Sequence, residues 1–281
     1  MSRTPCRRIR PAKGAFAGVA VVALSLLPLV AAPVGMVAGA EASDSRLVQS
    51  AKRPGVPAVV AVARAFRGAP PPRFTSLTVK TTVSDDSLVG ETAYTLLRSD
   101  GLVTLVTEVT RATQRGGLGG ARRSTVTGRS RYVLGGLILV SADWKEVHED
   151  ADGSKQTLRD SAETTGFSRI SGSLFPLAVG KSLALTYRGR IKTAGRVVVK
   201  KMSYRVTRRF PAKQFDARLD GDIFVIRFRY EEEGAEEIFK GSEEIYYATA
   251  LGWPVRTRRQ EAQGGVVFET RLAAFTVKTG D

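Results

Sequence analysis

The stretch Leu174–Tyr187 reads LFPLAVGKSLALTY and contains the two kinds of signal that recur along the chain. Pro176 and Gly180 favour a turn, because proline fixes φ and glycine adopts backbone conformations that other residues avoid. Directly afterwards, apolar residues alternate from Leu183 to Tyr187, which is typical of a strand with one buried face. The stretch therefore predicts a turn that leads straight into a strand.

Similar strand patterns lie on both sides of this stretch, and Asp222–Tyr230 (DIFVIRFRY) is the clearest of them. Asp100-Gly101 and Asp152-Gly153 are typical of tight hairpin turns, and no amphipathic helix separates the strand candidates. So many short strands must curl to share one sheet. We expect an all-β fold with a strongly curved antiparallel sheet of about 10–12 strands, either an open half-barrel or a barrel. The candidate strands are Leu77–Val83, Thr92–Leu97, Leu102–Val109, Ser124–Leu134, Leu137–Val147, Lys155–Arg159, Leu183–Tyr187, Val197–Val206, Asp222–Tyr230, Glu236–Phe239, Glu243–Ala248, Val255–Glu261 and Val266–Val277.

The N-terminus has the composition of a secretory signal peptide over residues 1–42. A basic leader is followed by an uncharged apolar run from Ala15 to about Ala40, with small residues at its end. This predicts a periplasmic or secreted protein. The alternative is an uncleaved N-terminal membrane anchor, because the apolar run is long enough to span a bilayer. The basic residues of the leader are Arg3, Arg7, Arg8, Arg10 and Lys13.

Residues 43–72 are predicted to form a linker in which Val56–Phe66 can form a short helix. Pro70, Pro71 and Pro72 end any regular element there. The β-domain is expected to cover 73–281. No cysteine follows the leader, so disulfides, thiolate nucleophiles and cysteine-bound metals are excluded after it.

The net charge is +16, and removal of the leader leaves +12, because 1–42 holds five positive charges and one negative charge. This excess of positive charge favours an anionic lipid or an envelope polyanion as the partner. The protein is expected to be membrane-proximal at most. Plain solubility is the alternative reading. Nucleic acid is not expected, because few aromatic residues lie among the charges to stack on bases.

No catalytic residue, metal site or cofactor site is predicted, so the protein is expected not to be an enzyme. His148 is the only histidine, lacks a partner at zinc-ligand spacing, and is expected at the surface. No G-x-S-x-G motif is present. The acidic runs around Glu146–Asp152 and Glu231–Glu237 are expected at solvated hairpin tips. An enzyme remains the third reading and requires two carboxylates to converge in a cleft.

The favoured function is binding of an amphipathic anionic ligand, a lipid or a glycan precursor, in the concavity of the sheet. In DIFVIRFRY one face is apolar and the other changes from apolar to basic along the strand, which would suit a cavity with a cationic mouth. An ordinary sheet with a core side and a wet side is the alternative. The candidate ligand-binding residues are Arg227, Arg229, Arg256, Arg258, Tyr187, Tyr204 and Trp253.

The alternative function is a structural or interaction module that docks an envelope protein partner through an edge strand or a basic face. Residues 188–213 hold ten lysines or arginines and no acid. The candidate partner-binding residues in this stretch are Arg205, Arg208 and Arg209.

Three motifs in residues 174–278 resemble a family of exported bacterial β-domains of unknown function. They are FPLAVGK at 175–181, PAKQFDA at 211–217, and IYYA at 245–248 followed by LGWPVR at 251–256. The family pattern has a glycine where Lys213 stands here. The resemblance implies an exported antiparallel β-domain and carries no catalytic residues.

Overall fold

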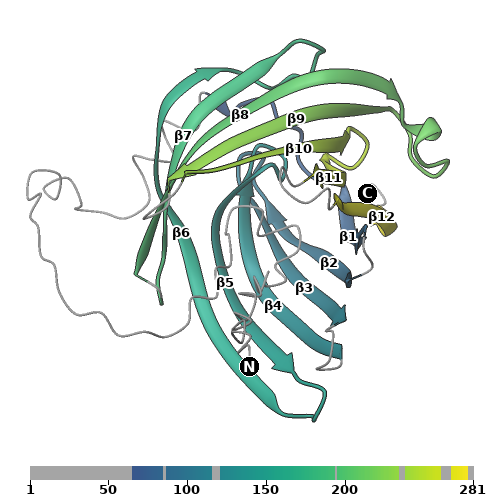
Figure 1. The fold of residues 1–281 in the computed structure, drawn as a ribbon. Helices are drawn as coiled ribbons and strands as arrows, with labels where there is room; N and C mark the ends of the chain where they lie inside the picture. Colours follow the sequence, from purple (N-terminus) through teal and green to yellow (C-terminus); the bar gives the residue numbers. More distant parts are fainter. Residues whose placement is uncertain are drawn as a thin grey trace, which may run out of the picture.

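A computed structural model describes residues 65–84, 87–115, 121–193, 195–233, 238–260 and 267–277. Within these residues twelve strands form a closed antiparallel barrel, in which each strand pairs with its neighbours in the chain and the first pairs with the last (Figure 1). The strands are β1 Phe74–Val83, β2 Leu88–Ser99, β3 Thr104–Arg115, β4 Ala121–Val133, β5 Ile138–Glu149, β6 Lys155–Gly172, β7 Ser182–Ile191, β8 Arg196–Pro211, β9 Asp222–Glu233, β10 Ile238–Ala248, β11 Trp253–Gln260 and β12 Val267–Val277. A short 3₁₀ helix, η1 Ala212–Gln214, joins β8 to β9.

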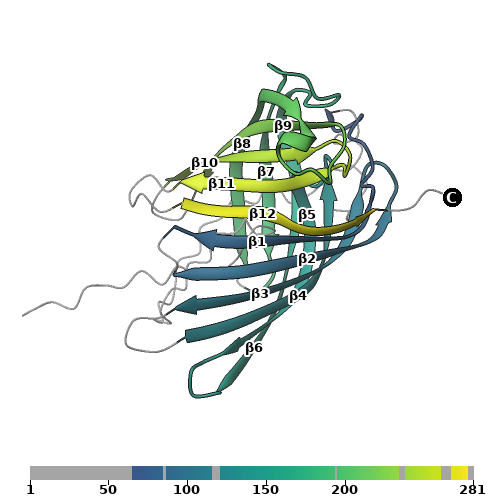
Figure 2. The same ribbon diagram turned by 90° about the vertical axis from the view of Figure 1, so that its right-hand side faces the viewer.

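The all-β prediction is confirmed, and the barrel is the correct one of the two expected shapes. Closure comes from β1 and β12, which pair in register from Phe74↔Val277 to Val83↔Phe268 with two shifts. β12, β1, β2 and β3 run side by side along this wall (Figure 2). Because closure uses the first and last strands, it gives both of them a second hydrogen-bonded neighbour.

The strand bounds differ most from the sequence prediction at β6. The prediction ended at Arg159, but the strand runs on to Gly172. Its first half pairs with β5 and its second half with β7. These two pairings keep the segment in strand conformation, although it is rich in serine and threonine and its apolar and polar residues alternate poorly. The two candidates Glu236–Phe239 and Glu243–Ala248 belong to one strand, β10, although 236–237 lie outside the described residues.

The turn and strand predicted at Leu174–Tyr187 agree with the structure. The peptide bond between Phe175 and Pro176 is cis, Gly180 has a φ of 93°, and β7 begins at Ser182. Residues 174–278, which carry the family resemblance, cover β7–β12. These strands pair with β6 and β1, so both halves of the chain share one barrel.

One end of the barrel is filled by large apolar side chains. Phe66, in the segment assigned to the linker, is buried there and packs edge-on against Phe167 at 5.6 Å between ring centroids. Trp253 lies beneath the β4–β5 turn, where Gly136 has a φ of 87°. A Cβ on Gly136 would lie 2.6 Å from the Trp253 ring, so only glycine allows this close approach.

The opposite end carries the β5–β6 hairpin, which projects beyond the neighbouring strands (Figures 1 and 2). Leu158 shares the inner face with buried Glu146, which it faces across the β5–β6 pair, yet Leu158 is 55% exposed. Phe239 shares the inner face with Glu232 and is 40% exposed. The inner wall is therefore accessible to solvent at this end. We call it the open end.

Candidate functional site: the barrel interior

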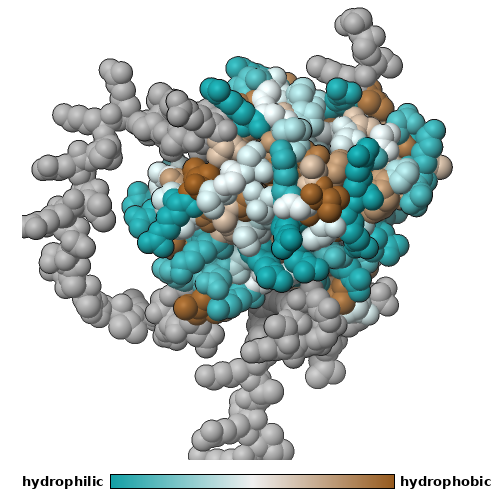
Figure 3. Space-filling view, turned by 90° about the horizontal axis from the view of Figure 1, so that it is seen from above, coloured by the Kyte–Doolittle hydropathy of each residue, from teal (hydrophilic) through white to brown (hydrophobic). Residues whose placement is uncertain are grey.

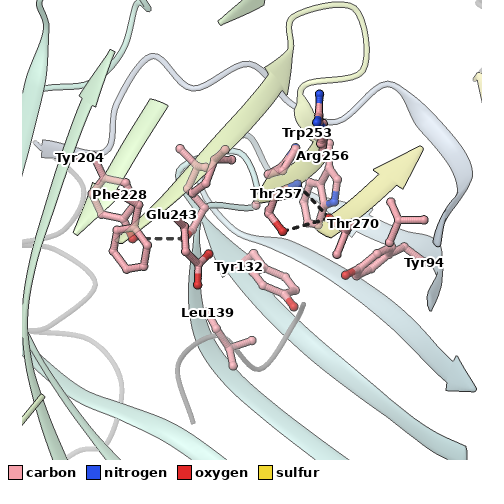
Figure 4. Close-up of a pocket in the computed structure, with 15 residues that line it drawn as sticks. Tyr94, Tyr132, Leu139, Tyr204, Phe228, Glu243, Trp253, Arg256, Thr257 and Thr270 are labelled. Atoms are coloured by element: carbon pink, nitrogen blue, oxygen red, sulfur yellow. Dashed lines mark hydrogen bonds between the residues drawn. The ribbon is translucent and has the colours of Figure 1, made fainter. Parts of the chain in front are cut away.

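A cavity of about 70 Å³ lies inside the barrel between the aromatic end and a polar layer of the inner wall (Figure 4). This space can hold several water molecules or one small chemical group. Its walls come from β1, β2, β4, β5 and β8–β12, together with the turn between β4 and β5. The lining residues are Val79, Tyr94, Tyr132, Gly136, Leu137, Leu139, Tyr204, Phe228, Glu243, Ile245, Trp253, Pro254, Arg256, Thr257 and Thr270.

Aromatic rings line most of the apolar side of the cavity. Trp253 contacts Tyr94 and Tyr132 edge-on, with ring centroids 6.0 Å and 5.3 Å apart. Tyr204 stacks on Phe228 at 4.7 Å across the β8–β9 pair. Edge-on and offset arrangements are the favoured geometries of aromatic pairs, so these rings hold one another in fixed positions around the cavity.

Glu108 on β3 is buried next to this aromatic group. The Tyr132 hydroxyl donates a hydrogen bond of 2.5 Å to Glu108 Oε1. Burial raises the pKa of Glu108 to about 7, although hydrogen bonds from Tyr132 and Ser130 favour the charged form. The carboxyl group is therefore partly protonated at neutral pH and can then both donate and accept a hydrogen bond.

We expect Glu108 to make the protein less stable as the pH rises. The folded-state pKa of about 7 exceeds the ordinary value of 4.5. The stabilising contribution is therefore complete below that ordinary value and is lost as the pH rises through the folded-state pKa. The size corresponds to roughly 3 kcal/mol. Urea unfolding at several pH values should show this loss in the parent protein and a flatter profile in Glu108→Gln. Parallel profiles would contradict the prediction.

Glu243 on β10 is the second buried acid and lines the cavity itself. It is 5% exposed and lies opposite Phe228 on β9 and Arg259 on β11. Burial raises the pKa of Glu243, while the positive charges of Arg259 and Lys200 act against this shift. Thr257 and Thr270 add hydroxyl groups 3.0 Å apart on the same wall. The polar side of the cavity thus combines carboxyl and hydroxyl groups.

A buried ion-pair network follows toward the open end. Lys200 Nζ lies 2.8 Å from Glu232 Oε2, and each side chain is 1% exposed. Arg196 Nη2 is 3.0 Å from the other oxygen of Glu232. Burial lowers the pKa of Lys200, against the attraction of Glu232 and Glu243. Lys200 and Arg196 therefore share the single negative charge of Glu232, a carboxylate of the chain itself.

The prediction that the acidic runs lie at solvated tips is wrong for Glu146 and Glu232, which are buried on the inner wall. The expectation that His148 lies at the surface is also wrong, because its side chain is only 17% exposed and its Nε2 is 3.1 Å from Glu146 Oε1. The reason is strand parity: Glu146 and His148 continue the inner face that Ala142 begins on β5.

The predicted ligand-binding residues fall into two groups that the barrel wall separates. Tyr187, Tyr204 and Trp253 are buried inside. The four arginines, Arg227, Arg229, Arg256 and Arg258, lie on the outer wall. On β9 the inner face is occupied by Phe228 and Tyr230, so the arginines between them point outward.

Arg256 lines the cavity, but its guanidinium group points away from the interior (Figure 4). It lies 4.8 Å from the centroid of the Tyr246 ring and pairs with Glu269 at 2.6 Å. The prediction of a cationic mouth built from these arginines therefore does not match the structure.

The predicted partner-binding residues Arg205, Arg208 and Arg209 are all exposed. Arg205 and Arg208 lie on the outer wall of β8, whereas Arg209 is opposite Phe224 and lies over its ring at the end of the strand. Arg208 pairs with Glu244 at 3.6 Å and Arg209 with Asp222 at 2.8 Å. The prediction that a partner docks through an edge strand does not fit this sheet, because its first and last strands, β1 and β12, pair with each other and close the barrel.

Glu108 and Glu243 were not named as site residues from the sequence. The sequence signal that could have identified them is their position two residues away from an apolar residue of the same strand. Glu108 follows Val106 by two positions and Glu243 precedes Ile245 by two, which places each acid on the inner face. Their partners come from other strands and could not be read from local sequence.

In the described part of the chain, no group of three histidine, cysteine or carboxylate side chains is arranged to hold a metal ion. The helical residues of that part form no segment long and apolar enough to cross a membrane.

Neither a family model nor a curated protein matches the chain. The family pattern at 174–278 therefore stays a prediction. The chain is similar to a solved β-barrel-like protein of the DUF1849 domain of unknown function from Brucella abortus, with a TM-score of 0.47 and 9% identity over 76% of this chain and 100% of that one. It is also similar to a Bacteroides fragilis protein described as exported, with a YmcC-like fold (TM-score 0.38, 10% identity, 73% of this chain and 99% of that one).

Proposed function

We propose that the chain is an exported, non-enzymatic protein whose barrel binds an amphipathic ligand, a lipid or a lipid-linked glycan precursor. The observation that carries this proposal is the cavity, which has aromatic rings on one side and Glu243, Thr257 and Thr270 on the other. Export is supported by the basic and apolar leader in residues 1–42.

The size of the cavity defines how such a ligand would lie. About 70 Å³ accommodates only one small group, so the rest of the ligand would extend along the inner wall toward the open end. Exposed Leu158 and Phe239 supply apolar surface there. Two of the inward acids support binding over catalysis, because Glu108 is hydrogen-bonded to Tyr132 and Glu232 is paired with Lys200.

The polar part of the ligand is better matched by hydrogen bonding than by a negative charge. The arginines expected to hold an anion are outside, and Lys200 and Arg196 are paired with Glu232. Carboxyl and hydroxyl groups suit ligands with several hydroxyl groups, as in a glycan. Of the two ligand classes, the glycan-bearing one is therefore favoured.

The test is mass spectrometry of small molecules extracted from protein purified from its native host. We expect one reproducible amphipathic species with the parent protein. Ile245→Phe adds bulk to the cavity wall and should reduce the bound amount at least fivefold, an expected outcome on the order of one kcal/mol. The control is Ile238→Phe, the same change on the same strand at a residue that is 61% exposed on the outer wall.

A parent protein that is repeatedly empty after this extraction would refute the proposal. Equal retention by both variants would place the ligand outside the cavity and would also refute it. Circular dichroism and urea unfolding of each variant ensure that loss of ligand is not loss of fold.

A further inference from the structure

Three arginines form a compact group on the outer wall of β8 and β9. Arg205 and Arg227 are direct partners across this strand pair, and Arg229 lies two positions further along β9 on the same face. Directly opposed side chains have Cβ atoms roughly 5 Å apart, and the diagonal neighbours are about 7–8 Å apart. All three side chains are exposed. We call these residues the arginine triad.

In the part of the chain that the structure describes, no carboxylate forms an ion pair with the triad. The nearest acid in register with Arg227 is Glu244, and its carboxylate pairs instead with Arg208 at 3.6 Å. Glu231, two positions beyond Arg229, pairs with Lys240 at 3.1 Å. Neighbouring acids are therefore engaged with other cations.

Opposed like charges destabilise an antiparallel strand pair, so Arg205 and Arg227 repel each other across β8 and β9. Glu244, opposite Arg227 on β10, offsets only part of this repulsion because it pairs with Arg208. A guanidinium group offers planar, paired donors that match the oxygens of a phosphate group. A phosphate within reach of both strands would remove the repulsion between these side chains and make hydrogen bonds with each. The group has the chemistry of a phosphate-binding surface.

The surroundings of the triad favour a charged lipid surface over a protein partner. Ser203 and Ser242, which flank Arg229 on the neighbouring strands, are polar and exposed. The face over β7, β8 and β9, seen from above, is largely hydrophilic with separate hydrophobic spots (Figure 3). Protein interfaces usually have an apolar centre, whereas the neighbours of Arg229 are polar and the exposed apolar residues Val197 and Ile238 lie at the ends of β8 and β10.

We propose that the arginine triad docks the outer wall of the barrel on the phosphate groups of an anionic bilayer. Exposed Arg208 and Arg258 flank the triad and extend the positive surface across β8–β11. The proposal does not depend on ligand binding inside the barrel, because these side chains lie on the other side of the wall.

The test compares sedimentation of the full chain with vesicles of pure phosphatidylcholine and with vesicles that also contain phosphatidylglycerol. We expect binding only to the second kind and a steep loss with added salt. The triple variant Arg205→Gln/Arg227→Gln/Arg229→Gln should lower the partition coefficient by roughly tenfold to a hundredfold. The matched control is Arg111→Gln/Arg123→Gln/Arg129→Gln, which removes the same charge from exposed positions on β3 and β4.

Equal losses in both triple variants would overturn the proposal, because net charge and not the triad would then control binding. Binding of soluble inorganic polyphosphate without vesicle binding would overturn it as well, as would capture by an acidic protein alone. Mass spectrometry of the triad variant should still find the interior ligand, so failure here and failure of ligand binding can be told apart.

Discussion

Glu232→Gln is expected to lower the free energy of unfolding by about 3 kcal/mol or more. The carboxylate of Glu232 is 1% exposed and neutralises Lys200, which is equally buried. Removing one partner leaves the other charge in the barrel interior without its counterion, and this costs more than the pair contributes when intact. Equilibrium unfolding in urea, followed by circular dichroism, measures the change.

Two further variants test this explanation. Glu231→Gln alters the adjacent residue, whose side chain is 41% exposed, and should change the stability by no more than about 0.5 kcal/mol. The double variant Glu232→Gln/Lys200→Met removes both charges and should recover more than half of the loss. If Glu232→Gln costs no more than Glu231→Gln, the buried pair does not have the predicted role.

Trp253→Ala is expected to cost about 3–5 kcal/mol of stability. Its ring is buried and contacts Phe74, Tyr94 and Tyr132 edge-on, so its removal leaves a cavity that rigid neighbours cannot fill. Thermal or urea unfolding measures the loss. It should also loosen the wall of the binding cavity, and retention of the native ligand should fall with it.

Trp144→Ala provides the matched comparison, because Trp144 is only partly buried on the inner face of β5. It should cost clearly less than Trp253→Ala. Trp253→Phe keeps an aromatic ring in the same place and should recover part of the stability. Equal costs for Trp253→Ala and Trp144→Ala would show that the ring contacts are not the source of the effect.

The fold was largely readable from sequence because most strands carry their own alternation of apolar and polar residues and the tight turns carry typical turn residues. The closure of β1 on β12 could not be predicted from sequence, because a strand paired on one side and a strand paired on both sides have the same hydrophobic pattern. The sequence prediction ended β6 too early because Gly166 and its serine- and threonine-rich neighbours weaken the local strand pattern. In the structure, pairing with β5 and β7 extends the strand in spite of this weak pattern.

The site was predicted less well, for reasons of parity and register. The pattern of DIFVIRFRY was recognised correctly as two faces, but sequence does not state which face is turned inward. Phe228 and Tyr230 take the interior, so Arg227 and Arg229 are outside. The pairing of Arg205 with Arg227 depends on the register of β8 and β9, which local sequence leaves open.

The pairing of β1 with β12 also bears on when the fold can form. Thr75 hydrogen-bonds to the Thr276 carbonyl across 201 positions of the chain. The wall cannot close until the last strand is available, and such distant pairings form slowly. Until then the leading strand keeps an unpaired edge, which is prone to pair with other chains. A barrel of this kind depends on protection of that first strand until the last strand has paired with it.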